Sequence, residues 1–362
     1  MDERARPLPD ETDFAGRRAA DSRARQRRRR ILLCIALLLL LLLLCGMVYL
    51  LTRIVGLPQH RKVVAGTRGV QVVFAAYAWG PGPEQRLTKP PGVAYDPRNK
   101  RIYVTDTMSA RVIVFDSRGR NGRVFAEGEP KAKRQDLGEA TLFRPLGIDV
   151  GDDGTVYVCD PEKAAVSAFS PEGEKVDEFR LMHPRYVAVH GERLYVLTKG
   201  SLLVLDTAGN EVGRYGEFGR GPDQLVWPAG VSVGADGTIL IADTNNYRIV
   251  ALGRDLKRKW VYGEPAFDRE QQSKRQLASP MGVTFDGRGH AWLVDGLNSH
   301  IRAFTPDGKP YGSPVGQAGD LEDEFYYPLG IDWMEDDLFV LADRFHDRIV
   351  GVRLDPEAEP EE

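Results

Sequence analysis

The chain of 362 residues is poor in the features that stabilise or decorate secreted domains. It has three cysteines, Cys34, Cys45 and Cys159, and the first two lie in a hydrophobic run near the N-terminus. The C-terminal body therefore cannot form an internal disulfide bond. The sequence also contains no Asn-x-Ser/Thr site for N-glycosylation. These two absences favour a bacterial source over a glycosylated ectodomain.

The motifs of several enzyme classes are also missing. There is no Gly-x-Ser-x-Gly nucleophile elbow and no phosphate-binding loop. The six histidines include no pair at the close spacing of metal ligands. The segment from Asp149 to Gly154 superficially resembles a calcium loop, but it lacks alternate-residue ligand spacing and fits a hairpin turn. The sequence therefore predicts no catalytic residue and no metal ligand, and it favours a non-enzymatic protein.

Charge is unevenly distributed along the chain. Residues 1–30 have ten arginines and six acidic residues, so the remainder carries −7 when the whole chain carries −3. A basic head on an acidic body indicates membrane topology rather than nucleic-acid binding. Glycine and proline are abundant, at 38 and 23 residues, and long helical patterns are few. This composition is typical of many short strands joined by turns.

A run of 21 uncharged residues at 31–51 contains twelve leucines. As a helix it would be about 31 Å long, close to the ~30 Å hydrocarbon core of a bilayer. Six of the eight residues at 23–30 are arginines, which are retained on the cytoplasmic side of membranes. The run is too long for a signal peptide and no small-x-small cleavage site follows it. These features predict an uncleaved single-pass signal anchor in contact with membrane lipid, with a cytoplasmic N-terminus and an exported body.

The anchor sets the predicted limits of the other segments. The body begins where the sequence starts to repeat, and it ends before an acidic run. The predicted segments are a basic cytoplasmic tail at 1–30, the transmembrane anchor at 31–51, a linker at 52–67, a folded body at 68–354 and an acidic tail at 355–362.

The body is built from repeated units that begin with Pro-x-Gly and an apolar residue. Their spacing of 39 to 55 residues lies in the range of propeller blades. Each unit contains short segments of alternating apolar residues separated by Gly/Asp/Asn turns, which is typical of hairpin-connected strands. Four strands per unit and six units predict an all-β, six-bladed β-propeller. The units begin at Pro90, Pro145, Pro184 (a degenerate "PRYV"), Pro228, Pro280 and Pro328.

The last unit has only three strands before the chain leaves the pattern near Leu354. The segment "VQVVFAAYAWG" at 70–80 lies ahead of the first unit, where fourth strands lie in the other units. We therefore expect residues 70–78 to form the outer strand of the final blade. This pairing would close the ring and remove two exposed sheet edges.

An aspartate ends the second strand in five units, and an arginine follows five positions later in three of them. Asp243 and Arg248 in "IADTNNYRIVAL" are one example. A carboxylate that caps backbone N–H groups and faces an arginine is a structural device, and a catalytic residue would not recur around a ring. These residues resemble the NHL repeat family over roughly residues 68–354. The resemblance implies a propeller that serves mainly as a binding platform and occasionally as an enzyme.

Other propellers of similar fold include peptidyl-hydroxyglycine lyases, which bind zinc through channel histidines. Gluconolactonase-like and strictosidine-synthase-like propellers need an acidic, often calcium-bearing channel. These resemblances imply an alternative function, a hydrolase or lyase with a metal in the central channel. Calcium or zinc is expected only under that alternative, and no cofactor is predicted otherwise.

The residues that precede each Pro-x-Gly are expected to ring one mouth of the channel, beside the loops that leave the second strands. Arginine, aromatic and amide groups gather there and suit a peptide, a glycan or an anionic ligand. His183 is interpreted as polar rim rather than as a metal ligand. The ring also includes Ser279, and the neighbouring loops add Asn298, Phe345 and His346. The binding candidates are Lys89, Arg144, His183, Arg185, Trp227, Tyr247 and Tyr327.

The sequence as a whole predicts a membrane-anchored, extracytoplasmic NHL-type propeller that acts as a binding or scaffold module. The expected location is a bacterial cell membrane. The expected partner is an envelope protein, a peptide or a glycan, and nucleic acid is not expected because the body is acidic.

Overall fold

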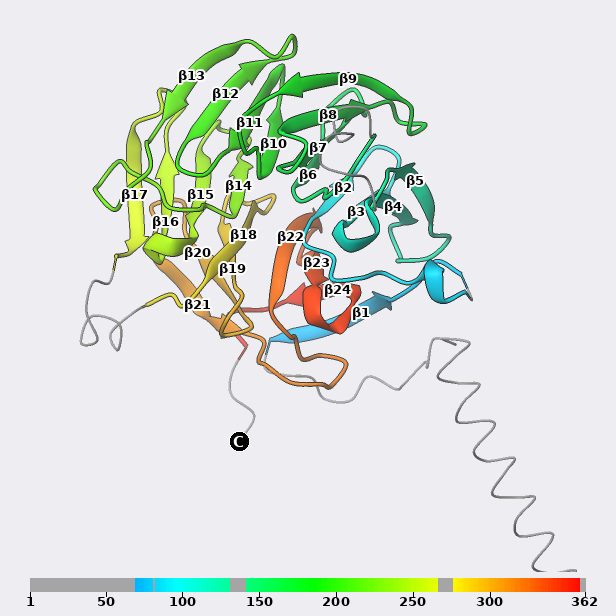
Figure 1. Ribbon diagram of the computed structural model, residues 1–362. Coiled ribbons are helices and arrows are strands. Elements are labelled where there is room, and N and C mark those ends of the chain that lie inside the picture. The colour runs from blue at the N-terminus through cyan, green and yellow to red at the C-terminus, as the bar shows by residue number, and fades with distance from the viewer. Residues whose placement is uncertain (1–68, 81, 131–140, 266–275, 359–362) are drawn as a thin grey trace, which may run out of the picture. The chain divides into compact units, whose positions relative to one another are not determined.

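The computed structural model describes residues 69–80, 82–130, 141–265 and 276–358. These residues form six four-stranded sheets arranged as blades around one axis (Figure 1). The prediction of an all-β, six-bladed propeller is therefore confirmed. The anchor predicted at 31–51 and its flanking segments lie outside the described residues. Among the residues that are described, no helix is long and apolar enough to cross a membrane.

Burial along the strands follows from the way the blades stack. In the fourth blade, strands β15 (Ile239–Asp243) and β16 (Arg248–Leu252) are buried along their whole length. The outermost strand, β17 (Arg258–Gly263), has no fully buried residue. Neighbouring blades therefore cover both faces of the middle strands, and the rim of the blade meets solvent.

The first three blades follow one another along the chain, and each runs from an inner to an outer strand. The third repeat forms a complete blade although its sequence is degenerate. The strands are β2 (Val93–Asp96), β3 (Arg101–Asp106), β4 (Arg111–Asp116) and β5 (Arg123–Glu127); β6 (Ile148–Val150), β7 (Val156–Asp160), β8 (Ala165–Phe169) and β9 (Lys175–Arg180); and β10 (Tyr186–His190), β11 (Arg193–Leu197), β12 (Leu202–Asp206) and β13 (Glu211–Tyr215).

The remaining blades have the same order, except that the sixth takes its outer strand from the start of the chain. Short 3₁₀ helices interrupt the loops at η1 (Pro83–Gln85), η2 (Thr107–Ser109), η4 (Thr244–Asn246) and η5 (Arg344–His346). The strands are β14 (Gly230–Val233), β15, β16 and β17; β18 (Pro280–Phe285), β19 (Ala291–Asp295), β20 (His300–Phe304) and β21 (Pro310–Val315); and β22 (Pro328–Glu335), β23 (Leu338–Asp343), β24 (Arg348–Leu354) and β1 (Val70–Ala76).

The hydrophobic core is divided among the interfaces between blades. Six clusters of buried residues each join two consecutive blades. Between blades four and five, for example, Leu240 and Ala242 share a cluster with Val283 and Leu293. A fully buried aliphatic side chain stabilises a fold by about 1.5–3 kcal/mol. The stability of each blade therefore depends on both of its neighbours.

Glycine lets the inner strands approach one another around the channel. A Cβ atom on Gly230 would lie 2.1 Å from the carbonyl oxygen of Met281 in the next blade. A Cβ atom on Gly92 would lie 2.4 Å from the carbonyl oxygen of Leu146. The Pro-x-Gly repeat therefore has a glycine because the neighbouring backbone leaves no room for a side chain.

Strand β1 closes the ring as expected. It pairs antiparallel with β24, from Val70 opposite Leu354 to Ala76 opposite Ile349, with a bulge between Val72 and Phe74. The strand ends at Ala76, two residues before the predicted limit. Because β24 has a partner, the sixth blade has four strands like the others.

We predict that Gly351→Val weakens this closure by about 1–3 kcal/mol, the usual effect of overpacking a filled space. A Cβ atom on Gly351 would lie 2.1 Å from the Phe74 ring, which covers the glycine from β1. Urea unfolding followed by circular dichroism measures the change. Val73→Ala, on the exposed side of β1, is the control and should stay within about 0.5 kcal/mol of wild type. An unchanged Gly351→Val protein would contradict the packing of Phe74.

Candidate functional site

The recurring aspartate at the end of the second strand is part of the framework. In blade four, Asp243 is fully buried. One of its carboxylate oxygens accepts a hydrogen bond from the Val226 N–H at 2.8 Å. The other accepts bonds from the Asn246 amide at 2.8 Å and from Arg248 Nε at 2.9 Å. The carboxylate thus ties the second strand to the segment that leads into the inner strand of the same blade.

The same arrangement recurs with small variations. Arg111 Nε lies 2.9 Å from the Asp106 carboxylate, and Arg348 Nε lies 2.8 Å from that of Asp343. In blade five His300 takes the place of the arginine. Asp295 there accepts bonds from the Ser279 N–H and from the Asn298 amide. The aspartate that begins this loop is therefore structural in these four blades, as the sequence predicted.

These ties bring two kinds of loop to one face of the propeller. The Asn245 N–H donates to the Val226 carbonyl at 3.1 Å, and the Phe345 N–H donates to the Tyr326 carbonyl at 3.1 Å. We call this side the entry face, because the chain enters each inner strand here. The hairpin turns between first and second strands lie at the other end, which we call the turn face.

Four of the residues predicted to ring the entry-face mouth have left-handed backbone conformations. Lys89, His183, Trp227 and Tyr327 have φ values between 49° and 55°. Such conformations are unfavourable for residues other than glycine, and they cluster where the surrounding structure fixes them. Lys89, Arg144 and His183 are exposed, and Trp227 and Tyr327 are half-buried.

Two cation–aromatic groups include several of the predicted residues. The Arg185 guanidinium lies 5.1 Å from the Trp227 ring, and Lys199 Nζ lies 5.4 Å from the same ring. Elsewhere on this face, Lys89 Nζ lies 5.6 Å from the Phe345 ring, which stacks on Tyr327 at 5.5 Å.

The other predicted residues lie apart from these groups. Arg144 and His183 form no ion pair or ring contact among the described residues. Tyr247 ends η4 and is half-buried, with a φ of 57°. The structure therefore divides the predicted ring into two cation–aromatic groups and a remainder.

The narrowest part of the channel, which we call the waist, is closed on one side by the Tyr186 side chain. A small cavity of about 50 Å³ lies at the level of the Pro-x-Gly glycines, and Tyr186 lines it in place of a glycine. The ring packs against the cluster between blades three and four and against the one between blades five and six. Tyr186 therefore extends across the narrow part of the channel and separates its two ends.

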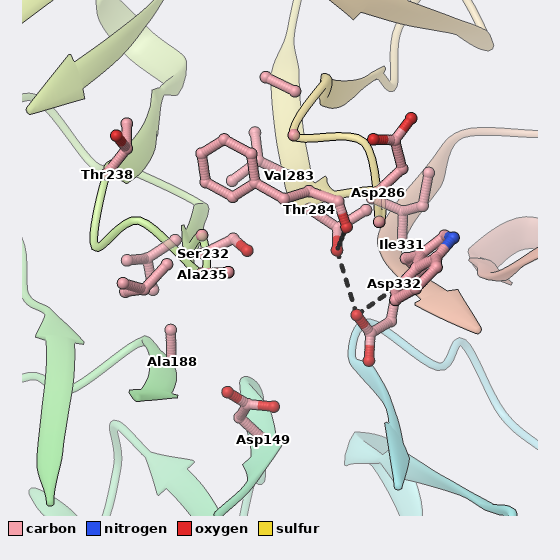
Figure 2. Close-up of a pocket in the computed structure, with 18 of the residues that line it drawn as sticks. Asp149, Ala188, Ser232, Ala235, Thr238, Val283, Thr284, Asp286, Ile331 and Asp332 are labelled. Atoms are coloured by element: carbon pink, nitrogen blue, oxygen red, sulfur yellow. Dashed lines mark hydrogen bonds between the residues drawn. The ribbon is translucent and has the colours of Figure 1, made fainter. Parts of the chain in front are cut away.

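The turn face opens into a larger cavity of about 680 Å³ (Figure 2). On the inner strands its walls are mainly valines and isoleucines, with Ser232, Thr284, Asp149 and Asp332 as polar groups, and the turns at its rim add further polar side chains such as Asp286. The sequence reasoning missed this site. The signal in the sequence was the position two residues after the repeat glycine, or after Tyr186 in unit three. The residues at this position are Ala94, Asp149, Ala188, Ser232, Thr284 and Asp332.

The two cavity carboxylates bridge neighbouring inner strands. Asp149 accepts the N–H of Val189 in the next blade at 2.7 Å. Asp332 accepts the N–H of Tyr95 at 2.7 Å and the Thr284 hydroxyl at 3.2 Å. The free edge of an inner strand exposes unpaired N–H groups to the channel, and these carboxylates satisfy two of them.

Burial raises the pKa of both cavity carboxyls above the ordinary value of an aspartate. Burial raises the pKa of Asp149 to about 7, and the charge of Asp332 adds to the effect. Burial also raises the pKa of Asp332 to about 6, although the hydrogen bond from the Tyr95 N–H acts to lower it. Within the described residues, no three His, Cys, Asp or Glu side chains are grouped as they would be to hold a metal ion.

Comparison with known proteins supports the fold and gives two family matches. Residues 81–200 match the SMP-30/Gluconolactonase/LRE-like region, and residues 225–252 match the NHL repeat. The chain is 24% identical over 229 residues to Protein SUPPRESSOR OF QUENCHING 1, chloroplastic, of Arabidopsis thaliana. That alignment covers 61% of this chain but only 20% of the plant protein.

Two solved enzymes have a similar fold. Virginiamycin B lyase from Staphylococcus aureus superimposes with a TM-score of 0.53 at 12% identity, covering 79% of this chain and 99% of the enzyme. A gluconolactonase from Xanthomonas campestris gives a TM-score of 0.54 at 14% identity, covering 81% of this chain and 94% of the enzyme. At these identities the likeness shows the propeller fold alone.

We predict that Asp243→Ala destabilises the protein by about 3–5 kcal/mol, because it leaves the buried Arg248 guanidinium without a counter-charge. Asp295→Ala is the matched control in blade five, where no arginine faces the carboxylate. It should lose about 1–3 kcal/mol for the unsatisfied N–H groups alone. Urea unfolding measures both, and equal losses would show that the arginine pairing adds nothing.

A second prediction concerns pH. The Asp149 pKa is raised in the folded state, so ionisation favours unfolding and stability should fall as pH rises from about 4 to about 7. Asp149→Asn should flatten this decline in thermal midpoints measured across the range. Asp153 is the control: burial would raise its pKa, but hydrogen bonds from Thr155 outweigh burial and lower it. Asp153→Asn should leave the decline intact, and a decline that persists in Asp149→Asn would contradict the assignment.

Proposed function

We propose that this protein is a membrane-anchored binding module whose entry face docks a protein or peptide partner. The observation that carries the proposal is the distribution of exposed apolar side chains over the propeller. In the described chain, large exposed hydrophobic residues lie either on outermost strands or in entry-face loops. Those of the entry face are Tyr77, Met108, Met182, Phe218, Leu297, Leu321, Tyr326 and Phe345.

Cations accompany these apolar groups near the channel mouth. Lys199 Nζ lies 4.5 Å from the exposed Phe218 ring, and the Arg344 guanidinium lies 5.5 Å from Phe345. Aromatic residues, methionine and arginine are the side chains enriched in protein interfaces and in their energetic hot spots. Clustered apolar exposure of this kind marks interaction sites. A macromolecular partner therefore fits the entry face better than ordinary contact with solvent.

The membrane anchor belongs to the same proposal. Residues 31–51 would hold the propeller at a bacterial cell membrane, with residues 1–30 in the cytoplasm and the propeller outside. The partner would then be an envelope protein, a peptide or a glycan-bearing protein, and not nucleic acid. Protease accessibility of a C-terminal tag in intact cells tests which side of the membrane the propeller occupies. In cells with a permeable outer layer, a tag that stays protected from protease would contradict a propeller outside the cytoplasm.

A hydrolase or lyase is the second candidate, favoured by the match of residues 81–200 to the SMP-30/Gluconolactonase/LRE-like region. Such an enzyme would work in the channel, where Asp149 and Asp332 are the carboxylates on the inner strands. Both already accept backbone N–H bonds from the next blade, which supports a structural role for them. Stoichiometric calcium or zinc in the purified full-length protein, measured by mass spectrometry, would favour the enzyme.

We predict that a photo-reactive amino acid at Phe345 cross-links to one partner in intact cells, because this side chain lies exposed within the entry face. The same amino acid at Glu335, which is exposed on the turn face, is the matched control and should give no product. Gel mobility and mass spectrometry of the adduct measure the outcome. Equal labelling at both positions, or labelling only at Glu335, would contradict the proposed docking face.

A further inference from the structure

Blade three departs from the repeat at the point where the channel is narrowest. In the other blades, Pro is followed by an apolar residue and glycine, whereas blade three has Arg185 and Tyr186. The apolar positions lie at the floor of the entry-face mouth, and Ala229, Met281 and Leu329 are buried there. Arg185 is therefore the one charged side chain among the six equivalent positions.

Arg185 has no anionic partner. Its guanidinium lies over the Trp227 ring, but it makes no hydrogen bond and no ion pair with any described residue. Its Nε atom is buried and unpaired. By contrast, Arg111, Arg248 and Arg348 are each bound to a repeat aspartate. The structure thus pairs its framework arginines and leaves this one unsatisfied.

A second unsatisfied arginine comes from blade six. In blades one and four, the residue after the repeat aspartate is a threonine, Thr107 or Thr244. Each threonine donates a hydrogen bond to the carbonyl of the next blade's proline, at 2.5 and 2.8 Å. Arg344 replaces this threonine and makes no such bond. Its Nε atom is also buried without a partner, and its guanidinium lies 5.5 Å from the Phe345 ring.

The Tyr186 side chain lies beside Arg185, whose guanidinium is 5.9 Å from the Tyr186 ring, and it packs against the cluster between blades five and six. Burial raises the pKa of Tyr186, and the positive charges of Arg185 and Arg344 both act to lower it. The hydroxyl forms no hydrogen bond with any of the described residues. Two guanidinium groups and one hydroxyl near the narrow part of the channel therefore include donors that have no acceptor among the described residues.

We propose that Arg185, Arg344 and Tyr186 form a binding site for a carboxylate of the docked partner. This inference rests on the proposed docking face and identifies the chemical group of the partner that would bind at its centre. Unpaired buried donors are unfavourable, and an oxyanion that accepts from both arginines satisfies them with charge-assisted bonds. A carboxylate offers two oxygens in one plane, one for each guanidinium, and this matches the planar arrangement of the arginine N–H groups. The carboxylate is a peptide C-terminus or an Asp or Glu side chain.

The test measures binding of the detergent-solubilised full-length chain to two immobilised libraries of random decapeptides. One library ends in free carboxylates and the other in amides, and inorganic phosphate serves as a soluble competitor. We expect binding that Arg185→Met and Arg344→Met each weaken about ten- to hundredfold, the range for a lost charge-assisted hydrogen bond. Tyr186→Phe keeps the ring in the waist and should weaken binding less. Arg288→Met, an exposed arginine of the turn face, should leave binding unchanged.

A stability measurement separates a binding role from a structural one. Because Arg185 is unsatisfied in the free protein, Arg185→Met should keep or raise the thermal midpoint while it weakens binding. A structural arginine would instead lower the midpoint when removed.

The library results distinguish the sources of the carboxylate. Binding to the free-acid library alone assigns the site to a C-terminus, and binding of acidic sequences from both libraries assigns it to a side chain. Binding that survives Arg185→Met and Arg344→Met, competition by phosphate at lower concentration than by acetate, or no binding to either library overturns the carboxylate site. The proposed function is decided separately by cross-linking at Phe345, so the docking face can stand where the carboxylate site fails.

Discussion

The fold depends on a buried carboxylate that, in five of the six blades, joins the second strand to the segment entering the inner strand. In blade four, Asp243 receives bonds from Val226, Asn246 and Arg248, and removing it leaves the Val226 N–H and Arg248 Nε without an acceptor. Val226 lies two residues before Pro228, so its hydrogen bond to Asp243 also fixes the direction in which the Trp227 side chain leaves the backbone. The entry face is therefore positioned by a repeated structural device, and the residues beside that device vary without disturbing the ring.

The repeat made the fold predictable because its signals are local. Turn residues, alternating strands and the Pro-x-Gly spacing are each read within one unit, and the missing strand of the last unit pointed to residues 70–78. The face shared by Trp227 and Phe345 followed from the same logic. The cavity carboxylates did not, because Asp149 and Asp332 matter only through the backbone of the next blade. Tyr186 was seen as part of a degenerate repeat, and its place in the waist became visible only when the glycines of the other blades were assembled around it.

The channel is divided into two ends of unlike chemistry. At the entry face, unpaired arginines and exposed aromatic rings surround the mouth. At the turn face, Asp149 and Asp332 face a cavity with hydroxyls and aliphatic walls. Tyr186 stands between these ends where the other blades have glycine or a small gap. Tyr186 therefore separates the two mouths of the channel from each other.

The pairing of Val70 with Leu354 has a consequence for the order of events during synthesis. The first strand to leave the ribosome has its hydrogen-bonding partner among the last residues translated, so it must wait for nearly the whole chain. Contacts of such long sequence separation form slowly, because the loop entropy is lost before the contact is gained. Until β24 arrives, the nascent chain carries two open sheet edges that can pair with other chains. A ribosome that stops before β24 is translated would release a chain that cannot complete its circle.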